Sequence, residues 1–330
     1  MTKPETLATI AIVAYPNAQM SAVLGLCDLF MIANRYAGQD GGTQIAVTEV
    51  SERSIDDPAL ARFDAVILPP SLDHKGCNEQ KALHAWLRKQ HAAGALMCSV
   101  CAGVFWLGHS GLLDGRSVTT HWAHEDEFRA TFPNTQLNVD HLLVDDNDIV
   151  TAGGLMAWPD LGLFIVNRWL GSQVVSATAR HLLIDPAGRE QRNYRSFRPS
   201  LSHGDDAILA LQHWLEGHFD TKVTVHSMAE QARLSSRTFL RRFKAATGHT
   251  PNTYLQNLRI EKARGLLERT RIPISEIGWN VGYRDTSAFA RIFRATTGLT
   301  AGEYRNRFGI LTRNASLQSP ESYLSDGRTV

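Results

Sequence analysis

Two decamers of nearly the same sequence, fifty residues apart, constrain the fold of this chain more than any other feature. FLRRFKAATG occupies positions 239–248 and FARIFRATTG occupies positions 289–298, with six of ten residues identical. Each copy has Phe at its first and fifth positions, a spacing that places both rings on one face of a helix. Basic side chains fall on the other faces. The repeat therefore predicts two copies of one amphipathic, basic helix.

The residues around each copy predict where these helices begin and end. Ser235 and Asp285 stand four residues before the leading Phe, where a polar side chain caps a helix N-terminus. Gly248 and Gly298 follow as C-terminal stops. A short helical stretch and a tight turn precede each copy, SMAEQARL in the first and ISEIGWNVGY in the second. Helix, turn and basic helix is the helix-turn-helix pattern, whose second helix enters the major groove of DNA.

A pair of helical hairpins that only pack on each other is the alternative. Two copies in register, each with a cap, a Phe pair, outward arginines and a terminal glycine, favour the helix-turn-helix interpretation. Between them, residues 251–270 predict a helix of about 16–18 residues, or about 25 Å. Such a spacer suits two reading helices placed near the roughly 34 Å separation of successive major grooves.

Charge is distributed unevenly along the chain. The net charge of +1 conceals 17 Lys and Arg against 6 Asp and Glu between positions 221 and 313, a local balance of +11. The remainder, 17 Lys and Arg against 27 Asp and Glu, carries −10. A basic C-terminal third beside an acidic remainder indicates a polyanion-binding module, although a basic helical face is often only solvated.

Residues 205–313 resemble the AraC/XylS-type double helix-turn-helix domain. The likeness is strongest in IPISEIGWNVGYRDTSAFARIFRATTGLTAGEYR at 272–305. Gly278 and Ala301 depart from the family pattern, which has Ala and Pro there, and neither lies in the reading helix.

The resemblance implies which side chains meet DNA. The residues expected to face the groove are Ser236, Arg237, Leu240 and Arg241 in the first copy and Thr286, Ser287, Ala290 and Arg291 in the second. Arg suits guanine O6 and N7, whereas Thr and Ala suit the thymine methyl group. Three further residues are expected to contact phosphate, where they would not distinguish one base sequence from another: Arg242, Lys244 and Arg294. The aromatic residues expected in the core are Phe239, Phe243, Phe289, Phe293 and Trp279.

The first 170 residues alternate short β-type runs with helical patterns. The expected strands are 7–15, 44–51, 63–70, 94–100 and 147–154, and the expected helices are 21–35, 78–94 and 158–171. This alternation predicts a mostly parallel sheet covered on both faces. The stretch 195–206 is rich in Ser, Pro, Gly and Arg and marks a domain boundary.

The stretch ALMCSVCAGVFWLGHSGLLDG carries the most suggestive chemistry of this region. An apolar strand runs into Cys101, and Ala102 and Gly103 lead into an apolar helix. A cysteine at such a turn meets the positive end of a helix dipole, which favours the thiolate. The turn resembles the cysteine elbow of the PfpI/ThiJ branch of the glutamine-amidotransferase-like fold. The segments 117–128, 149–166 and 177–191 also resemble that branch, specifically the GlxA-type regulators in which it precedes an AraC-type domain.

The resemblance implies a flavodoxin-like, glutamine-amidotransferase-like parallel sheet sandwich followed by an all-α domain with two helix-turn-helix motifs. The expected organisation is a sensor and dimerisation domain at 1–195, a linker at 196–204, the DNA-binding domain at 205–313 and a flexible tail at 314–330.

Catalysis at Cys101 is not expected. Enzymes of the superfamily use a carboxylic acid near the end of the first strand, and often a His directly after the Cys. Residues 15–27 contain no Asp or Glu, and Ala102 stands in place of the His. The loop that contributes to the oxyanion site in the enzymes reads LPPSLD here, and Pro70 has no N–H to donate. The alternative, a hydrolase or hydratase that uses Cys101 with His121 as base, stays open.

No metal, cofactor or disulfide is expected. Cys98 and Cys101 have CxxC spacing, but Cys98 lies in a buried strand, so redox pairing is not favoured. His121 and His124 have no cysteine cluster and no third ligand nearby in the sequence. The four cysteines do not form a disulfide framework, and no signal peptide or membrane span is apparent, which places the chain in a reducing cytoplasm.

These features predict a ligand-responsive transcription regulator. The expected partners are promoter DNA, RNA polymerase, a second copy of the chain and a small effector, and the resemblance implies an activator that answers to an amino-acid-like or quaternary-amine metabolite. The expected pocket residues are Cys101, Ala102, His121 and Trp122. Trp122 suits a cationic group by cation–π contact, although a structural Trp is the commoner case.

Overall fold

The computed structural model describes residues 7–37, 43–51, 54–55, 57, 62–185 and 189–310. The chain divides into two compact units between Gln191 and Arg192, and each is described by itself. The expected tail at 314–330 lies outside the described residues. Within the part of the chain that is described, no helix is long and apolar enough to cross a membrane.

The first unit is built on a six-stranded sheet in the order β2-β1-β3-β4-β8-β7, parallel except for the edge pair β7–β8. Its strands are β1 (Leu7–Ala14), β2 (Gln44–Ser51), β3 (Ala65–Leu68), β4 (Leu96–Val100), β7 (Leu143–Asp146) and β8 (Ile149–Ala152). Every residue of β3, β4 and β8 is buried, as expected for central strands covered on both faces. The edge strand β7 reads LVDD and is not fully buried at any position.

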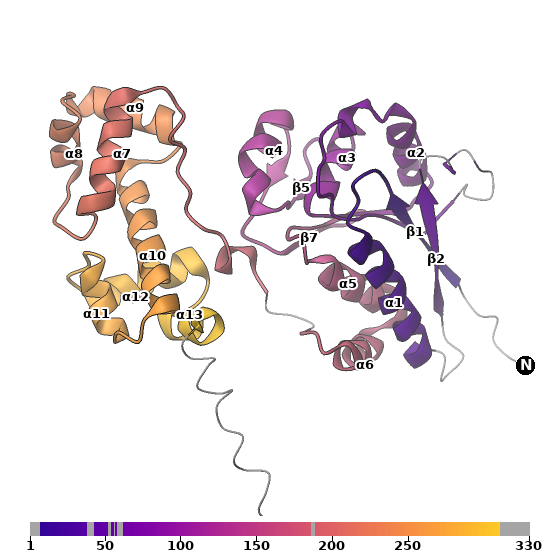
Figure 1. The fold of residues 1–330 in the computed structure, drawn as a ribbon. Helices are drawn as coiled ribbons and strands as arrows, with labels where there is room; N and C mark the ends of the chain where they lie inside the picture. The colour runs from indigo at the N-terminus through magenta and orange to yellow at the C-terminus, as the bar shows by residue number, and fades with distance from the viewer. Residues whose placement is uncertain are drawn as a thin grey trace, which may run out of the picture. The chain divides into compact units, whose positions relative to one another are not determined.

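Helices cover the two faces of this sheet (Figure 1). The helices of the unit are α1 (Met20–Ala37), α2 (Lys81–Ala92), α3 (Val104–His109), α4 (Glu125–Thr131), α5 (Trp158–Leu170) and α6 (Ser172–Leu182). Helices α1, α5 and α6 pack together on one face, and α2 and α3 lie on the other. The strands β5 (Ser117–Val118) and β6 (Gln136–Leu137) form a separate two-stranded sheet that packs beside β7 and β8. The predicted parallel α/β architecture is confirmed.

The strand order fixes where a site can form. The chain moves from β1 outward to β2 and then crosses back to β3, so the order reverses between β1 and β3. In open α/β sheets, ligands bind outside the carboxyl ends of the strands at such a point. Tyr15 follows β1, Pro69 follows β3 and Cys101 follows β4, so all three stand at this edge.

The second unit is all helical. Its helices are α7 (Asp206–His218), α8 (Val225–Gln231), α9 (Ser236–Thr247), α10 (Pro251–Arg269), α11 (Ile274–Asn280), α12 (Thr286–Thr297) and α13 (Ala301–Phe308). Helix α10 has 19 residues, close to the predicted spacer, and is about 28 Å long at 1.5 Å per residue. Thr250 caps it by accepting from the Thr253 N–H.

Helix α10 supplies residues to two separate cores, one for each helix-turn-helix. Its first half gives Tyr254 and Leu258 to a core around Phe239 and Phe243. Its second half contributes to a core around the second pair of phenylalanines; the α10 residues there are Ile260, Ala263 and Leu267. All four phenylalanines of the repeat are buried, as predicted.

The prediction for Trp279 is wrong, because this side chain is 53% exposed. It stands on α11 one position after the buried pair Ile277 and Gly278. The helical pattern therefore turns its ring to solvent, whereas the sequence interpretation relied on the usual burial of tryptophan.

The segment that leads into the second unit packs on its helices. The Asn193 side chain donates to the Thr297 carbonyl (2.7 Å), and Arg264 donates to the carbonyls of Arg192 (3.0 Å) and Arg195. The Phe197 ring meets the Tyr254 ring edge to face, 5.1 Å between centroids. Gln212 binds the Ser200 carbonyl (3.1 Å), so residues within the predicted linker range also contact this unit.

Candidate nucleic-acid interface and cysteine turn

The two basic helices are delimited as the repeat predicts, with one difference between the copies. Gly248 and Gly298 end α9 and α12 in the left-handed conformation, with φ of 73° and 77°. Asp285 caps α12 by accepting from the N–H groups of Ser287 and Ala288. Ser235 occupies the same position before α9, but its hydroxyl donates to Thr238 Oγ1 and makes no cap.

Every residue predicted to face the groove lies on the exposed side of its helix. The exposed set comprises Ser236, Arg237, Leu240 and Arg241 on α9 and Thr286, Ser287, Ala290 and Arg291 on α12. Lys244 and Arg294, predicted at phosphate, are also exposed. Over the described ranges, Arg237, Arg241 and Arg291 take part in no salt bridge. These guanidinium groups are therefore available to an anionic partner.

Arg242 differs from the other predicted contacts. Its guanidinium donates twice to the Asp205 carboxylate, at 2.8 and 2.7 Å, and it is only partly exposed. The Arg242 guanidinium holds the pKa of the Asp205 carboxyl below its usual range. Asp205 also caps α7 by accepting from the Ile208 N–H. The geometry thus gives Arg242 a structural role, the attachment of α9 to the start of α7.

The cysteine turn has the sharp geometry that the sequence predicts. Cys101 follows β4 with φ of 54°, a left-handed conformation unusual for a residue with a side chain. Ala102 and Gly103 are buried, and a Cβ atom on Gly103 would lie 2.5 Å from the Leu68 carbonyl oxygen. The small neighbours are required because the turn presses against the end of β3.

Burial opposes the thiolate form that the position of Cys101 before a helix would favour. Burial raises the pKa of the Cys101 thiol to about 12, against a smaller opposing effect of the Ala102 N–H. The residue is 3% exposed. Desolvation outweighs the helix dipole, so the thiol is neutral at physiological pH.

Tyr15 occupies the end of β1, where the enzymes of the superfamily have a carboxylic acid. Its hydroxyl donates to the Pro69 carbonyl, and its ring stacks on Trp106 with 3.9 Å between centroids. Burial, together with the nearby Cys101 and Cys77 thiols, raises the pKa of Tyr15 well above its usual range. An aromatic stack and a neutral phenol thus fill the region beside the cysteine.

The residues of the predicted pocket are only partly accessible. Cys101 and Ala102 are buried, whereas His121 and Trp122 are half-buried and their rings lie 5.2 Å apart. The Thr120 hydroxyl donates to the Cys101 carbonyl (2.9 Å), which holds this segment against the turn. Burial lowers the pKa of His121.

Gln191, which the sequence interpretation missed, ties the same segment to the end of the first unit. Its buried amide donates to Thr119 Oγ1 (3.0 Å) and the Thr120 carbonyl (2.8 Å), and its oxygen accepts from the Trp122 N–H (3.2 Å). A Cβ atom on Gly153 would collide with this side chain. Nothing in the local sequence distinguishes this glutamine from a surface residue.

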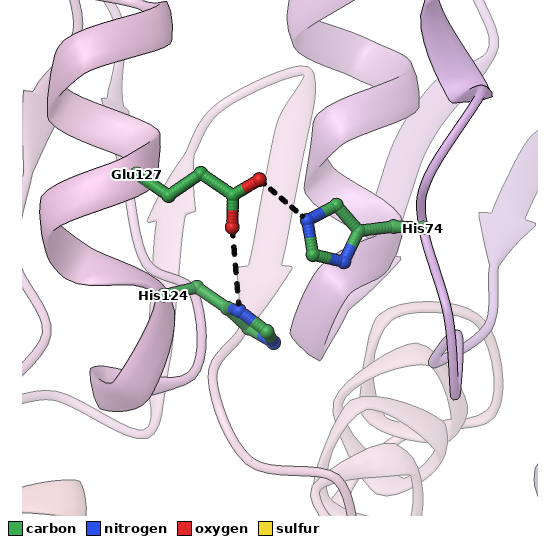
Figure 2. Close-up of side chains that lie close together, drawn as sticks. All are labelled: His74, His124 and Glu127. Atoms are coloured by element: carbon green, nitrogen blue, oxygen red, sulfur yellow. Dashed lines mark hydrogen bonds and ion pairs between the residues drawn. The ribbon is translucent and has the colours of Figure 1, made fainter.

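The structure also gives His124 the neighbours that the sequence interpretation did not find. His74, from the loop after β3, and Glu127, from α4, both turn toward it (Figure 2). His74 is fifty residues away from His124 in the sequence, whereas Glu127 is only three residues away. The sequence spacing therefore does not indicate that the three side chains meet.

The second unit holds a groove of about 630 Å³ beside α10, lined by residues that include Glu216, Lys262, Glu268 and Arg269. None of its lining residues belongs to α9 or α12. Its walls also include apolar side chains such as Phe219 and Leu258, and we assign it no function.

The fold and the exposed basic faces define a class of protein: a doubly wound α/β unit joined to a DNA-binding unit with two helix-turn-helix motifs. Residues 228–307 match the helix-turn-helix domain model, and residues 33–168 match the DJ-1/PfpI family model. The transcriptional regulator ArgR of Pseudomonas aeruginosa is 30% identical over 68% of this chain and 69% of its own length. The regulator GlxA of Rhizobium meliloti is 28% identical over 70% of this chain and 71% of its own length.

The chain belongs to this family of HTH-type transcriptional regulators, in which a DJ-1/PfpI domain precedes an AraC-type DNA-binding domain. It is a DNA-binding transcriptional regulator.

Proposed function

We propose that the chain is a cytoplasmic, effector-responsive activator that binds promoter DNA as a homodimer and contacts RNA polymerase. The two reading helices bind successive major grooves, with Arg241 and Arg291 on base edges and Lys244 and Arg294 on phosphate. The observation that supports this assignment is the exposure of the same four positions in both copies, above two phenylalanine-anchored cores.

The effector of this proposal is a small amino-acid-like or quaternary-amine metabolite held by the first unit. It would contact His121 and Trp122, with Cys101 and Ala102 beneath them. An effector changes DNA affinity only if it binds one arrangement of the protein better than another.

Gln191 supports a route for that coupling. It is bonded to the 119–122 segment of the first unit, and the next two residues, Arg192 and Asn193, are bonded to helices of the second. In this proposal, the peptide link between Gln191 and Arg192 is the route by which a shift of the 119–122 segment would reach the DNA-binding unit.

The proposal includes the absence of catalysis at Cys101. A buried neutral thiol beside Tyr15, rather than beside a carboxylate, lacks an activating group. The strained φ of Cys101 is the one observation that favours the alternative, a cysteine-dependent hydrolase or hydratase. Iodoacetamide labelling at pH 6, with Cys101→Ala to assign the signal, separates the two: we expect slower labelling of Cys101 than of a free thiol, and rapid labelling would support the enzyme.

The regulatory proposal is tested with the full chain and a DNA site selected from random sequence. Compounds that raise the melting temperature are tested for their effect on DNA affinity in the wild type and in Gln191→Ala. We expect Gln191→Ala to keep both binding activities and to lose most of the effector's influence on DNA. An effector that binds the first unit without changing DNA affinity in the wild type would contradict the sensor role.

A further inference from the structure

Two imidazole rings and a carboxylate converge in the first unit (Figure 2). His74 Nε2 lies 3.0 Å from Glu127 Oε1, and His124 Nδ1 lies 3.9 Å from Glu127 Oε2. One ligand atom from each of the three residues lies within 4.8 Å of the others. His74 comes from the loop after β3, whereas His124 ends a short 3-10 turn (Trp122–His124) and Glu127 lies in the first turn of α4.

The spacing of these atoms suits one transition-metal ion. Zinc binds imidazole nitrogen and carboxylate oxygen at about 2.0–2.2 Å, so two ligands of a tetrahedral ion stand about 3.4 Å apart. The two contacts of Glu127, 3.0 Å from Oε1 to His74 and 3.9 Å from Oε2 to His124, lie on either side of that value. One ligand atom of each residue lies within 4.8 Å of the other two, so the three side chains would draw closer together to share one ion.

The rings are held in place by an apolar wall. His74 stacks on Phe105 with 4.3 Å between centroids, and His124 meets the same phenylalanine edge to face at 5.9 Å. Phe105 is buried in α3, directly behind the cysteine turn. A metal site gains affinity when its ligands are oriented before the ion arrives, and this wall orients both rings.

The donor set of the cluster, two imidazole nitrogens and a carboxylate oxygen, suits a divalent transition-metal ion. A neutral imidazole is the form that coordinates metals. The carboxylate supplies negative charge next to the two nitrogens.

We propose that His74, His124 and Glu127 bind one divalent transition-metal ion of the zinc class in the first unit of this regulator. Two imidazoles and one carboxylate leave at least one coordination position for water or another small donor. The thiols of Cys77 and Cys101 are not part of the cluster, whose ligand atoms come from two imidazoles and one carboxylate. This proposal does not depend on the identity of an effector.

The test uses untagged full-length protein stripped with a chelator, with Zn²⁺ titrated by calorimetry and Co²⁺ followed by its visible spectrum. We expect one equivalent to bind. Loss of a residue that only supports a metal ligand typically weakens metal binding about 10–100-fold. Loss of a ligand itself should weaken it at least as much, and this is the expected result for His74→Asn, His124→Asn and Glu127→Gln. Glu127 is exposed, so Glu127→Gln remains folded and interpretable.

Two controls make the result specific. His141→Asn removes another imidazole beside a carboxylate, 3.3 Å from Glu190, and should leave the affinity unchanged. The double change of Cys77 and Cys101 to alanine should also leave it unchanged, and the cobalt spectrum should lack a thiolate charge-transfer band. No binding by the wild type, or unaltered binding by both His124→Asn and Glu127→Gln, would overturn the proposal, as would binding that disappears with the two thiols.

Discussion

The two helix-turn-helix copies present the same exposed positions but are supported in different ways. In the first copy, Arg242 ties the reading helix to the capping residue of α7, and Ser235 gives no cap. In the second copy Ile292 stands where the first has Arg242, and Asp285 caps the helix through two N–H groups. The exposed faces are thus determined by the repeat, whereas the supporting contacts are specific to each copy.

The turns between the paired helices differ as well. The left-handed position of the first turn is Arg233, with φ of 54°, and that of the second is Gly282, with φ of 85°. A Cβ atom on Gly282 would lie 2.8 Å from the Asp220 carbonyl oxygen. Arg259 also donates to the neighbouring Phe219 carbonyl (2.7 Å), so the second turn packs closely on the loop after α7. The first turn tolerates a side chain; the second does not.

The largest effect on stability should come from substituting the left-handed residue of each turn. Gly282→Ala should destabilise the second unit by about 2–3 kcal/mol, because it combines left-handed strain with overpacking. Arg233→Gly should have the opposite sign, a gain of less than about 1 kcal/mol, since the strain it relieves is partly offset by glycine entropy. Both stability changes are measured by urea unfolding, with hydrogen exchange of the amides in α11 and α9 as the readout for each turn. Equal effects in the two turns would remove the distinction drawn between them.

The next effect is a loss of DNA-binding affinity, which should be similar for the two copies. Lys244 and Arg294 occupy the same position of the repeat and are both exposed. Replacing either by alanine should weaken binding to all sequences and reduce the salt dependence by about one phosphate contact. Fluorescence anisotropy over a series of salt concentrations measures the slope. Lys222→Ala, which removes an exposed charge outside the reading helices, is the control and should change the slope less.

A loss of stability of about 1 kcal/mol is expected when Asp205, which holds Arg242 in the first copy only, is replaced. Asp205→Ala removes the cap of α7, a loss of about 1 kcal/mol, and also releases Arg242. The folded pKa of Asp205 is lowered, so its contribution is present above the unfolded value of about 3.9 and is lost as pH falls through the folded pKa. Unfolding of the wild type and the variant at a series of pH values should therefore converge in acid. Asp206→Asn removes a negative charge from the same turn without touching the contact between Asp205 and Arg242, and is the matched control.

The smallest effect concerns the caps of the reading helices. Asp285→Ala should cost up to about 1 kcal/mol, whereas Ser235→Ala should cost less, because only Asp285 accepts from helix N–H groups. Ser235→Asp should then stabilise the first copy. Thermal unfolding of the three variants measures the difference, and an equal cost for both alanine changes would show that Ser235 caps in solution.

Much of this structure could be predicted from the sequence because local periodicity governs it. The parallel sheet, the two reading helices, their terminal glycines and the four buried phenylalanines all follow from spacing in the chain. The exposure of Arg241 and Arg291 follows from the same spacing, because a residue two places beyond a buried phenylalanine lies on the opposite side of the helix.

What could not be predicted depends on contacts between distant segments. Trp279 is exposed because its helix turns it outward, although tryptophan is usually buried. The Cys101 thiol is neutral because surrounding side chains desolvate it, and Arg242 is paired because α7 begins beside it. The convergence of His74 with Glu127 requires the loop after β3 to meet α4, which no spacing in the sequence encodes.

The central claim is that both reading helices read DNA through arginines at equivalent positions. The most direct measurement selects preferred sites from random DNA with the wild type, Arg241→Ala and Arg291→Ala. We predict that each variant loses about 1–3 kcal/mol of preference at one base pair, and that the two affected pairs lie about one helical turn apart. Variants that bind every sequence more weakly while keeping the wild-type preference would contradict the claim.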